Sequence, residues 1–183
     1  KKTYSEADII IVSINCDLLK IKGSYGIDFD QFTKSIKEIA DNISEDSMVI
    51  IESTVPPGTS EKIIYPIFEE KFNARGIDIK KFSLAHSYER VMPGENYLDS
   101  ITNFWRVFAG INQLSAERCE AFLSQIINIK QFPLTRLKTM RASETAKLLE
   151  NSYRAVNIAF IEEWGRFAEE VGVDLYEVIE AIR

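Results

Sequence analysis

The sequence has few of the residues that mark several common kinds of site. Two cysteines and one histidine occur in 183 residues. These are too few for a disulfide framework or a cysteine-rich zinc site, so we predict no bound metal. Acidic residues outnumber basic ones by 28 to 22 and the net charge is −6, whereas a nucleic-acid-binding surface needs an excess of basic residues. The longest aliphatic run, Ile9 to Val12, is far too short to span a membrane.

Targeting signals are missing as well. No cationic stretch followed by an apolar core opens the chain, as it would in a secretory signal. We therefore predict a cytoplasmic protein without nucleic-acid or membrane partners. The chain begins at Lys1 and reaches its first apolar run within a few residues, which leads us to expect a piece of a longer protein.

What the sequence does contain is an alternation of short apolar runs and amphipathic stretches. Apolar runs without polar alternation are typical of parallel strands covered on both faces, and they occur at 8–14, 48–51, 82–85, 105–109 and near 129–134. Helical periodicity is found at about 28–43, from Thr59 or Ser60 to Phe72, where Pro66 predicts a kink, and after Ser115, which we expect to cap its helix. This alternation predicts an α/β fold with a mostly parallel sheet.

After Leu137 the pattern is helical only. Apolar residues recur every three or four positions from about 143 to 171, which predicts a helix of roughly 28 residues and about 42 Å. Gly172 is a natural stop, and Asp174 can cap a second helix. A helix of this length should leave the sheet, and its apolar stripe has more surface than one sheet can cover. We therefore predict a homodimer formed through it.

The segment from Glu52 to Thr59, ESTVPPGT, follows a predicted strand and opens a helix. Ligands bind at the carboxyl ends of strands in open α/β sheets, and a helix N-terminus favours anions. The alternative is a plain strand-to-helix turn, since proline and glycine are common in turns.

A second loop, residues 87–94, follows the third predicted strand and should reach the same edge of the sheet. Its Glu89 could serve as a general acid or base, or it could pair with the adjacent Arg90. The single histidine, His86, ends that strand, and we interpret it as structural.

Three polar residues share one face of the long predicted helix. Lys147, Asn151 and Arg154 are four and three positions apart, so their side chains lie on the same side. Lysine and asparagine on adjacent turns can together donate to one developing oxyanion. The alternative is a solvated strip on an amphipathic helix.

The glycines contain no GxGxxG spacing, so the dinucleotide-binding fingerprint of a complete Rossmann domain is absent. Neither cysteine has the environment of a nucleophile. Cys119 lies in an apolar helical stripe and Cys16 has no basic residue nearby in the sequence.

Three motifs together resemble the UDP-glucose/GDP-mannose dehydrogenase family. They are the segment 52–59, the segment 89–94 (ERVMPG) and the segment 147–154 (KLLENSYR). Their order and spacing also fit, and the similarity covers essentially the whole chain. The resemblance implies an enzyme that oxidises the C6 alcohol of a UDP-sugar to a carboxylate in two steps and reduces two NAD⁺.

The resemblance also implies a domain organisation. Residues 1–137 resemble the later part of the NAD-binding domain, with a Rossmann-like, mostly parallel sheet. Residues 138–183 resemble the long connecting helix and the start of an all-α central dimerisation domain. The glycine fingerprint would lie upstream of Lys1 and the catalytic cysteine downstream of Arg183, so we expect the isolated chain to be inactive.

Individual roles follow from the same motifs. Thr54 resembles the threonine that helps to place the water for thioester hydrolysis, and Glu89 resembles the glutamate of the active-site loop; both would also contact the cofactor, NAD. Lys147 and Asn151 resemble the pair that stabilises the C6 oxyanion and binds substrate. The resemblance implies that two arginines contact the substrate as well, namely Arg90 and Arg154.

Two departures from the family pattern bear on the substrate. Tyr88 replaces the proline that usually precedes the loop glutamate, and Pro93 stands where enzymes acting on UDP-glucose usually carry a second glutamate. Together with the YRAVNIA segment at 153–159, this resembles the branch that acts on UDP-N-acetylhexosamines. The alternatives are a β-hydroxyacid dehydrogenase, which also carries Lys-x-x-x-Asn on an interdomain helix, and a non-catalytic dimerisation module.

Overall fold

A computed structural model describes residues 2–21, 23–91 and 94–182. The chain divides into two compact units, Lys1–Ala146 and Lys147–Arg183. Two residues of the predicted Glu89 loop, Met92 and Pro93, lie outside the described residues.

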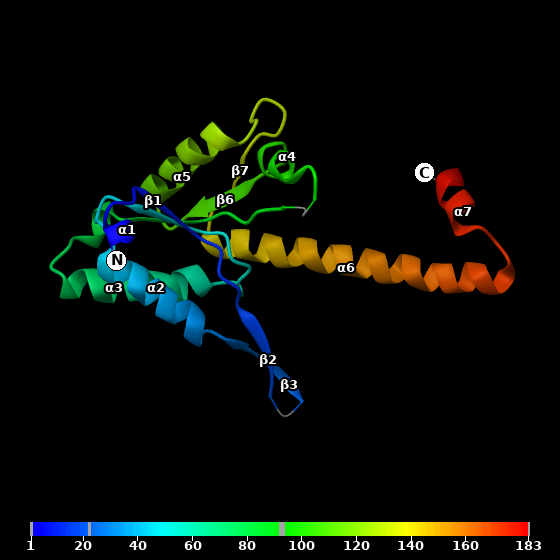
Figure 1. Ribbon diagram of the computed structural model, residues 1–183, viewed down its shortest axis with the longest axis horizontal. Coiled ribbons are helices and arrows are strands. Elements are labelled where there is room, and N and C mark those ends of the chain that lie inside the picture. Colours follow the sequence, from blue (N-terminus) through cyan, green and yellow to red (C-terminus); the bar gives the residue numbers. More distant parts are fainter. Residues whose placement is uncertain (1, 22, 92–93, 183) are drawn as a thin grey trace. The chain divides into compact units, whose positions relative to one another are not determined.

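The first unit is built around a mostly parallel β-sheet. Within the described residues its main sheet has five strands in the order β1-β4-β5-β6-β7 (Figure 1). β1, β4 and β5 run parallel, β6 is antiparallel to β5, and β7 is parallel to β6. The predicted α/β fold with a mostly parallel sheet is therefore confirmed. The strand bounds are β1 Ile9–Val12, β4 Met48–Ile51, β5 Ser83–His86, β6 Val107–Gly110 and β7 Thr135–Arg136.

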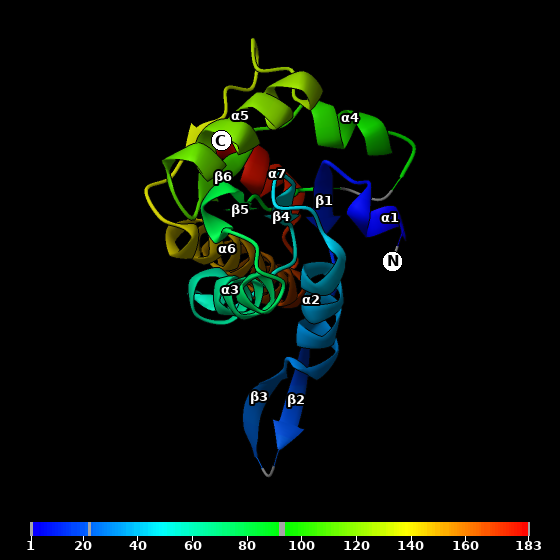
Figure 2. The ribbon, with the colours of Figure 1, turned by 90° about the vertical axis from the view of Figure 1, so that its left-hand side faces the viewer.

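Helices cover both faces of this sheet (Figure 2). α2 (Asp30–Asn42) and α3 (Tyr65–Ala74) lie on one face, and α5 (Gln113–Ile126) lies on the other. Successive side chains of a strand point to opposite faces. In β4, accordingly, Val49 and Ile51 join the core under α2 and α3, while Met48 and Ile50 join the core under α5. This is why the whole β4 run is apolar.

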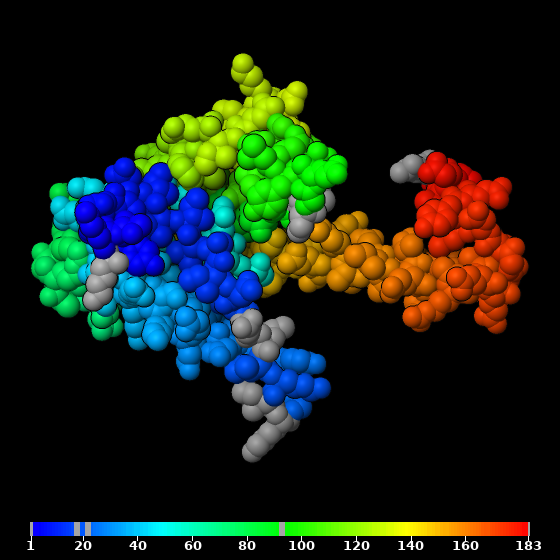
Figure 3. All heavy atoms as spheres, in the orientation of Figure 1, coloured from blue at the N-terminus to red at the C-terminus, as the bar shows by residue number. Residues whose placement is uncertain are grey.

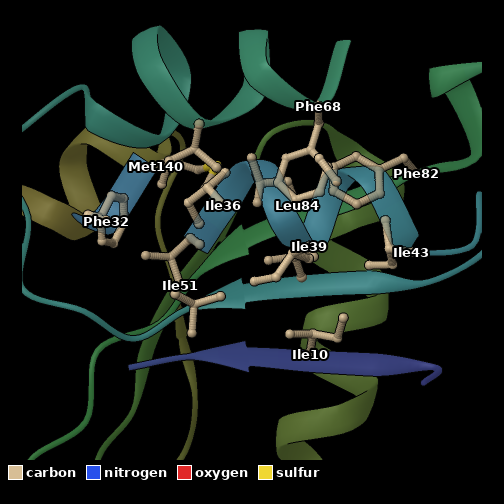
Figure 4. Packing of buried hydrophobic residues seen from close by; sticks show 14 of the residues in the cluster. Ile10, Phe32, Ile36, Ile39, Ile43, Ile51, Phe68, Phe82, Leu84 and Met140 are labelled. Atoms are coloured by element: carbon tan, nitrogen blue, oxygen red, sulfur yellow. The ribbon is translucent and has the colours of Figure 1, made fainter. Parts of the chain in front are cut away.

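The larger core lies between the sheet and the α2–α3 layer (Figure 4). Phe68 stacks on Phe82 with ring centroids 4.4 Å apart, and Phe72 meets Phe82 edge-on at 5.1 Å. Met140, the first residue of α6, is buried in this same core. The other buried side chains labelled there are Ile10, Phe32, Ile36, Ile39, Ile43, Ile51 and Leu84.

Two sequence expectations, one about the last strand of the sheet and one about the cap of α5, were wrong. The last strand is Thr135–Arg136 rather than 129–134, because the backbone pairs with β6 only from the Thr135 amide, which donates to the Arg106 carbonyl at 2.9 Å. The cap of α5 is Asn112, whose side chain accepts from the Ser115 amide at 2.8 Å. The Ser115 hydroxyl instead accepts from the Leu84 amide of β5.

Pro66 marks a change of helix type. The segment Ser60–Ile64 is a π-helix, and α3 follows from Tyr65, so that Pro66 lies in the first turn of α3. Proline is tolerated there because the first-turn amides need no partner within the helix.

Several short elements were not expected from the sequence. β2 (Asp17–Ile21) and β3 (Ser24–Asp28) form an antiparallel hairpin, and Gly23 in its turn has a φ of 90°. The others are the helices α1 (Lys2–Ser5) and α4 (Tyr97–Thr102) and a 3₁₀ turn at Ile79–Lys81.

The long predicted helix is present as α6, Met140–Val171, and it is followed by α7, Leu175–Ala181. Gly172 has a φ of 71° and Asp174 accepts from the Tyr176 amide at 2.8 Å, so the predicted stop and cap are confirmed. In the second unit bulky side chains of α6 lie at the surface (Figure 3). No helix of the described residues has both the length and the apolar character that crossing a membrane requires.

Candidate active site

A cleft opens at the carboxyl edge of the parallel strands in the first unit. β1, β4 and β5 point the same way, so the residues that follow them meet at one edge. The cavity there has a volume of about 230 Å³. Its walls come from the segments after β1, β4 and β5 and from α4 and the start of β6: Ser13, Glu52, Glu89, Val91, Tyr97, Ile101 and Arg106.

Glu89 is half-buried in the wall of this cleft, and its carboxylate accepts a hydrogen bond from the Val91 amide. The neighbouring Arg90 is held by aromatic groups. Its guanidinium carbon lies 5.3 Å from the Tyr88 ring centroid and 5.2 Å from that of Phe104, a cation–π arrangement. Tyr88, the unusual residue of this loop, therefore supports Arg90 directly.

A buried ion pair forms another wall of the cleft. Arg106, which is 7% exposed, contacts the carboxylate of Glu52. Its Nε also donates to the Ser87 hydroxyl at 3.1 Å, and that hydroxyl donates to the Val107 carbonyl at 3.0 Å. Burial lowers the pKa of Arg106 to about 10, which leaves it protonated at neutral pH. The pair therefore neutralises one carboxylate of the cleft.

Sequence reasoning missed Arg106, although a signal was present. A single arginine stands between apolar residues in the run that predicted a strand. A charged residue inside a buried strand needs a charged or hydrogen-bonding partner, and Glu52 at the end of β4 is that partner.

Thr54 lies on the same edge of the sheet but not in the wall of the cavity. Its side chain is exposed and follows Glu52 by two residues. The backbone around it is fixed, because the amides of Glu52 and Ser53 donate to the Val12 carbonyl at 2.8 and 3.1 Å.

The helix N-terminus after Gly58 is occupied by a carboxylate of the chain itself. Glu144, in the first turns of α6, accepts from the Ser60 amide at 2.8 Å and from the Gly58 amide. Thr59 stands at the expected N-cap position, but its side chain makes no capping hydrogen bond, because its hydroxyl donates to the Pro56 carbonyl at 2.7 Å. Burial raises the pKa of the Glu144 carboxyl, against the effect of these hydrogen bonds.

His86 and the two cysteines are not among the residues that line the cleft. His86 is buried at the end of β5, and its Nδ1 lies 2.8 Å from the Ser143 hydroxyl, as a structural histidine would. Burial raises the pKa of Cys119 to about 12, so its thiol stays protonated. Among the described residues, no cluster of acidic, histidine or cysteine side chains could hold a metal ion.

Lys147, Asn151 and Arg154 belong to the second unit. Lys147 is half-buried and Asn151 is exposed, while Arg154 lies 3.7 Å from the carboxylate of Glu150. The structure thus brings Glu89 together with Glu52, Arg106 and Ser13, and it places Thr54 on the same edge. That Lys147 and Asn151 join this cleft stays a prediction.

Comparison with known proteins covers nearly the whole chain. A family model described as the UDP-glucose/GDP-mannose dehydrogenase family, NAD binding domain, matches residues 1–127. The central domain of the same family matches residues 141–183.

Three individual proteins illustrate the likeness. A UDP-N-acetyl-D-mannosamine dehydrogenase of Methanocaldococcus jannaschii is 33% identical over 96% of this chain and 38% of its own length. The structure of UDP-D-ManNAc dehydrogenase from Pyrococcus horikoshii has a TM-score of 0.80 at 28% identity, over 98% of this chain and 40% of that one. A 3-hydroxyisobutyrate dehydrogenase of Mycobacterium tuberculosis, with a TM-score of 0.62 at 15% identity over 98% and 53%, shares the fold. The chain thus spans about two fifths of the length of these nucleotide-sugar relatives.

Proposed function

The chain belongs to the UDP-glucose/GDP-mannose dehydrogenase family, and from this premise we propose the activity of the complete protein. It oxidises the C6 alcohol of a UDP-sugar to the uronate in two steps, with UDP-N-acetylhexosamine preferred over UDP-glucose. The observation that carries the proposal is the cleft in which Glu89 meets Glu52 and Arg106 at the carboxyl ends of parallel strands, the place where open α/β sheets bind their ligands.

The substrate preference rests on two supports. The two nucleotide-sugar relatives named above act, by their names, on UDP-N-acetyl-D-mannosamine. The sequence also carries Pro93 instead of the second loop glutamate that is usual in enzymes of UDP-glucose. An acetamido-sugar substrate agrees with both.

The cofactor of the matched domain is NAD, and the cleft fits the nicotinamide end of that molecule. The carboxylate of Glu89 lines it and can face the cationic oxidised ring, whereas that of Glu52 is neutralised by Arg106. Ser13 offers a hydroxyl for the polar groups around the ring. When bound, NAD⁺ supplies the hydride acceptor; the chain's own residues bind, orient and exclude water.

The remaining roles are proposed by motif. Thr54, exposed beside the cleft, places the water for the hydrolytic step. Lys147 and Asn151 donate to the C6 oxygen as its negative charge develops, since two donors from adjacent helical turns can share one acceptor. The substrate contacts proposed for the two arginines differ: Arg90 is already held by aromatic rings, whereas Arg154 sits beside Glu150 on α6.

The proposed domain organisation places the NAD-binding part at 1–137 and the connecting helix and dimerisation region at 138–183. The apolar residues exposed along α6 in the second unit support a homodimer.

A substrate panel with the complete protein tests the function. We expect two NADH per UDP-N-acetylhexosamine consumed, and a kcat/KM about tenfold or more above that for UDP-glucose, the range that pocket contacts with one substituent provide. Replacement of Lys147 by Met should abolish turnover, while Lys138→Met serves as the matched control. Turnover of 3-hydroxyisobutyrate with none of any UDP-sugar would contradict the proposal and favour a β-hydroxyacid dehydrogenase.

The 183-residue chain alone provides a second check. We expect it to form no NADH, because it spans about two fifths of its relatives and neither of its cysteines matches the family nucleophile. NADH formation by this chain would contradict the proposed division of the active site.

A further inference from the structure

The first two turns of α6 contact the loop that carries Thr54 and the end of β5, from which the Glu89 loop starts. Residues 140–146 of this helix belong to the first unit. Two adjacent residues there, Ser143 and Glu144, are both fully buried. Glu144 contacts the segment that carries Thr54, and Ser143 contacts His86, the last residue of β5 before the Glu89 loop.

Glu144 holds the loop that carries Thr54. Its two carboxylate oxygens accept from the Ser60 amide, at 2.8 Å, and from the Gly58 amide. Gly58 has a φ of 92°, a conformation that side chains with a Cβ rarely adopt. Gly58, four residues beyond Thr54, therefore gives the end of this loop one defined backbone geometry. The Glu144 carboxylate, which comes from α6, fixes that geometry.

Ser143 holds the segment that carries Glu89. Its hydroxyl lies 2.8 Å from Nδ1 of His86, three residues before Glu89. From His86 the chain passes directly to Ser87, which accepts from Arg106, and Arg106 contacts Glu52. Buried polar contacts on either side of the His86–Ser87 peptide bond therefore connect α6 with two walls of the cleft.

We propose that Ser143 and Glu144 are positioning residues for the proposed oxidation: together they hold the Thr54 loop and the Glu89 loop in one fixed arrangement. The same helix continues without a break through Lys147 and Asn151, the two residues proposed to donate to the C6 oxygen. This inference rests on the proposed function, because the roles of Thr54 and Glu89 come from it.

A nearby ion pair provides a matched control. Arg141 contacts Glu61 at 2.7 Å, joining α6 to the π-helix, but the Arg141 side chain is 53% exposed. It links the same two elements through a partly exposed contact that involves the side chains of neither Ser143 nor Glu144. Glu61→Gln should therefore change neither loop.

The test combines kinetics with hydrogen exchange on the complete protein. In Glu144→Gln we expect kcat to fall about tenfold or more, because small misplacements of reacting groups are costly, while KM for NAD⁺ and sugar change less than about threefold. Exchange at residues 53–60 should become faster. Ser143→Ala should act in the same way on residues 86–91, and Glu61→Gln should leave kcat and both loops unchanged.

The outcomes are separable. If Glu144→Gln and Ser143→Ala lower the unfolding midpoint but leave kcat and loop exchange at the level of Glu61→Gln, the two residues are merely structural and the proposal is overturned. If the parent enzyme oxidises no UDP-sugar, the proposed function fails, and hydrogen exchange still decides whether these residues hold the loops. Should Glu144→Gln not fold, Ser143→Ala decides alone.

Discussion

At the level of single residues, the main feature is a pair of opposite charges that are largely buried. Arg106 and Glu52 lie together in the cleft wall, with side chains 9% and 15% exposed. Removing one partner of such a pair leaves an uncompensated charge in a poorly solvated place, whereas removing both does not. The loss of one partner leaves the other charge buried and unpaired. We therefore expect it to cost more stability than the attraction between the two charges contributes.

Replacement of Arg106 by Met is expected to destabilise the chain by about 3–5 kcal/mol, because the Glu52 carboxylate loses its partner. The double variant Glu52→Gln/Arg106→Met should recover a large part of that loss. Denaturant unfolding measures both. If the single and double variants are equally unstable, the loss comes from packing rather than from the buried charge.

The pH dependence of stability should report on Glu144. Burial raises the pKa of its carboxyl above the usual 4.5, so between 4.5 and the raised value the folded chain binds more protons than the unfolded chain. The contribution of this group is then full below 4.5 and is lost as pH rises through the raised pKa. We expect the free energy of unfolding of the parent, minus that of Glu144→Gln, to fall as pH rises above 4.5.

Nearby charges set the control for this measurement. Glu61 adds to the shift of Glu144, and Arg141 faces Glu61, so Glu61→Gln should be measured in parallel. If the difference in unfolding free energy between the parent and Glu144→Gln instead grew with pH, the pKa of Glu144 would be lowered by folding. The hydrogen bonds from the Gly58 and Ser60 amides would then outweigh the effect of burial.

At the scale of elements, close packing of β6 against α5 depends on one glycine. A Cβ on Gly110 would lie 2.3 Å from the Ala116 amide nitrogen and 2.8 Å from its Cα. Both are backbone atoms, so the neighbour cannot yield by rotating a side chain. Gly110 therefore determines how near the helix lies to the strand.

We expect Gly110→Ala to destabilise the chain by about 1–3 kcal/mol, the range of overpacked cores. The matched control is Gly165→Ala in α6, where an added Cβ meets nothing within 4 Å. That change should stabilise by about 0.5–1 kcal/mol, because alanine restricts the unfolded chain and favours helix. Thermal unfolding of both variants gives the comparison, and a neutral Gly110→Ala would mean that α5 can move.

The elements themselves could be predicted from the sequence where local pattern determines them. β4 is apolar at every position because both its faces are covered, and α6 shows its spacing over many turns. The cap of α5 and the last strand could not be predicted, since Ser115 is used by β5 and β7 depends on pairing with β6. The hairpin β2–β3 has no alternating apolar pattern that would have indicated it.

The site shows the same division. Glu52, Thr54 and Glu89 could be singled out because they follow strands, and strands of a parallel sheet end at one edge. Arg106 and Glu144 act through partners 54 and 84 to 86 residues away in the sequence. The apolar run around Arg106 could indicate that its charge needs a partner, but only the fold shows which residue that partner is.

At the scale of the whole molecule, the second unit leaves a large apolar stripe uncovered. The side chains predicted to form it are all at least 46% exposed, and they are Leu149, Tyr153, Val156, Phe160, Trp164, Phe167 and Val171. Contiguous exposed apolar surface of this kind is typical of association sites. A second copy of the chain, related by twofold symmetry, would cover it.

Trp164→Glu should shift the complete protein from dimer toward monomer, because a charge in the stripe would be buried without a partner. Arg166→Glu, which changes charge on the opposite side of the same helix, should leave the dimer intact. Light scattering over a range of concentrations measures both. A parent protein that is monomeric at every concentration would exclude dimerisation through this helix.

We propose that three separate stretches of the complete protein form one active site. A crystal structure of the complete protein with NAD⁺ and a UDP-N-acetylhexosamine tests it most directly. We predict that the nicotinamide ring lies against Glu89 with Thr54 beside it, and that Lys147 Nζ and Asn151 donate to the C6 oxygen of the sugar. A sugar bound away from Lys147, or a nicotinamide outside the cleft of Glu52 and Glu89, would contradict the account.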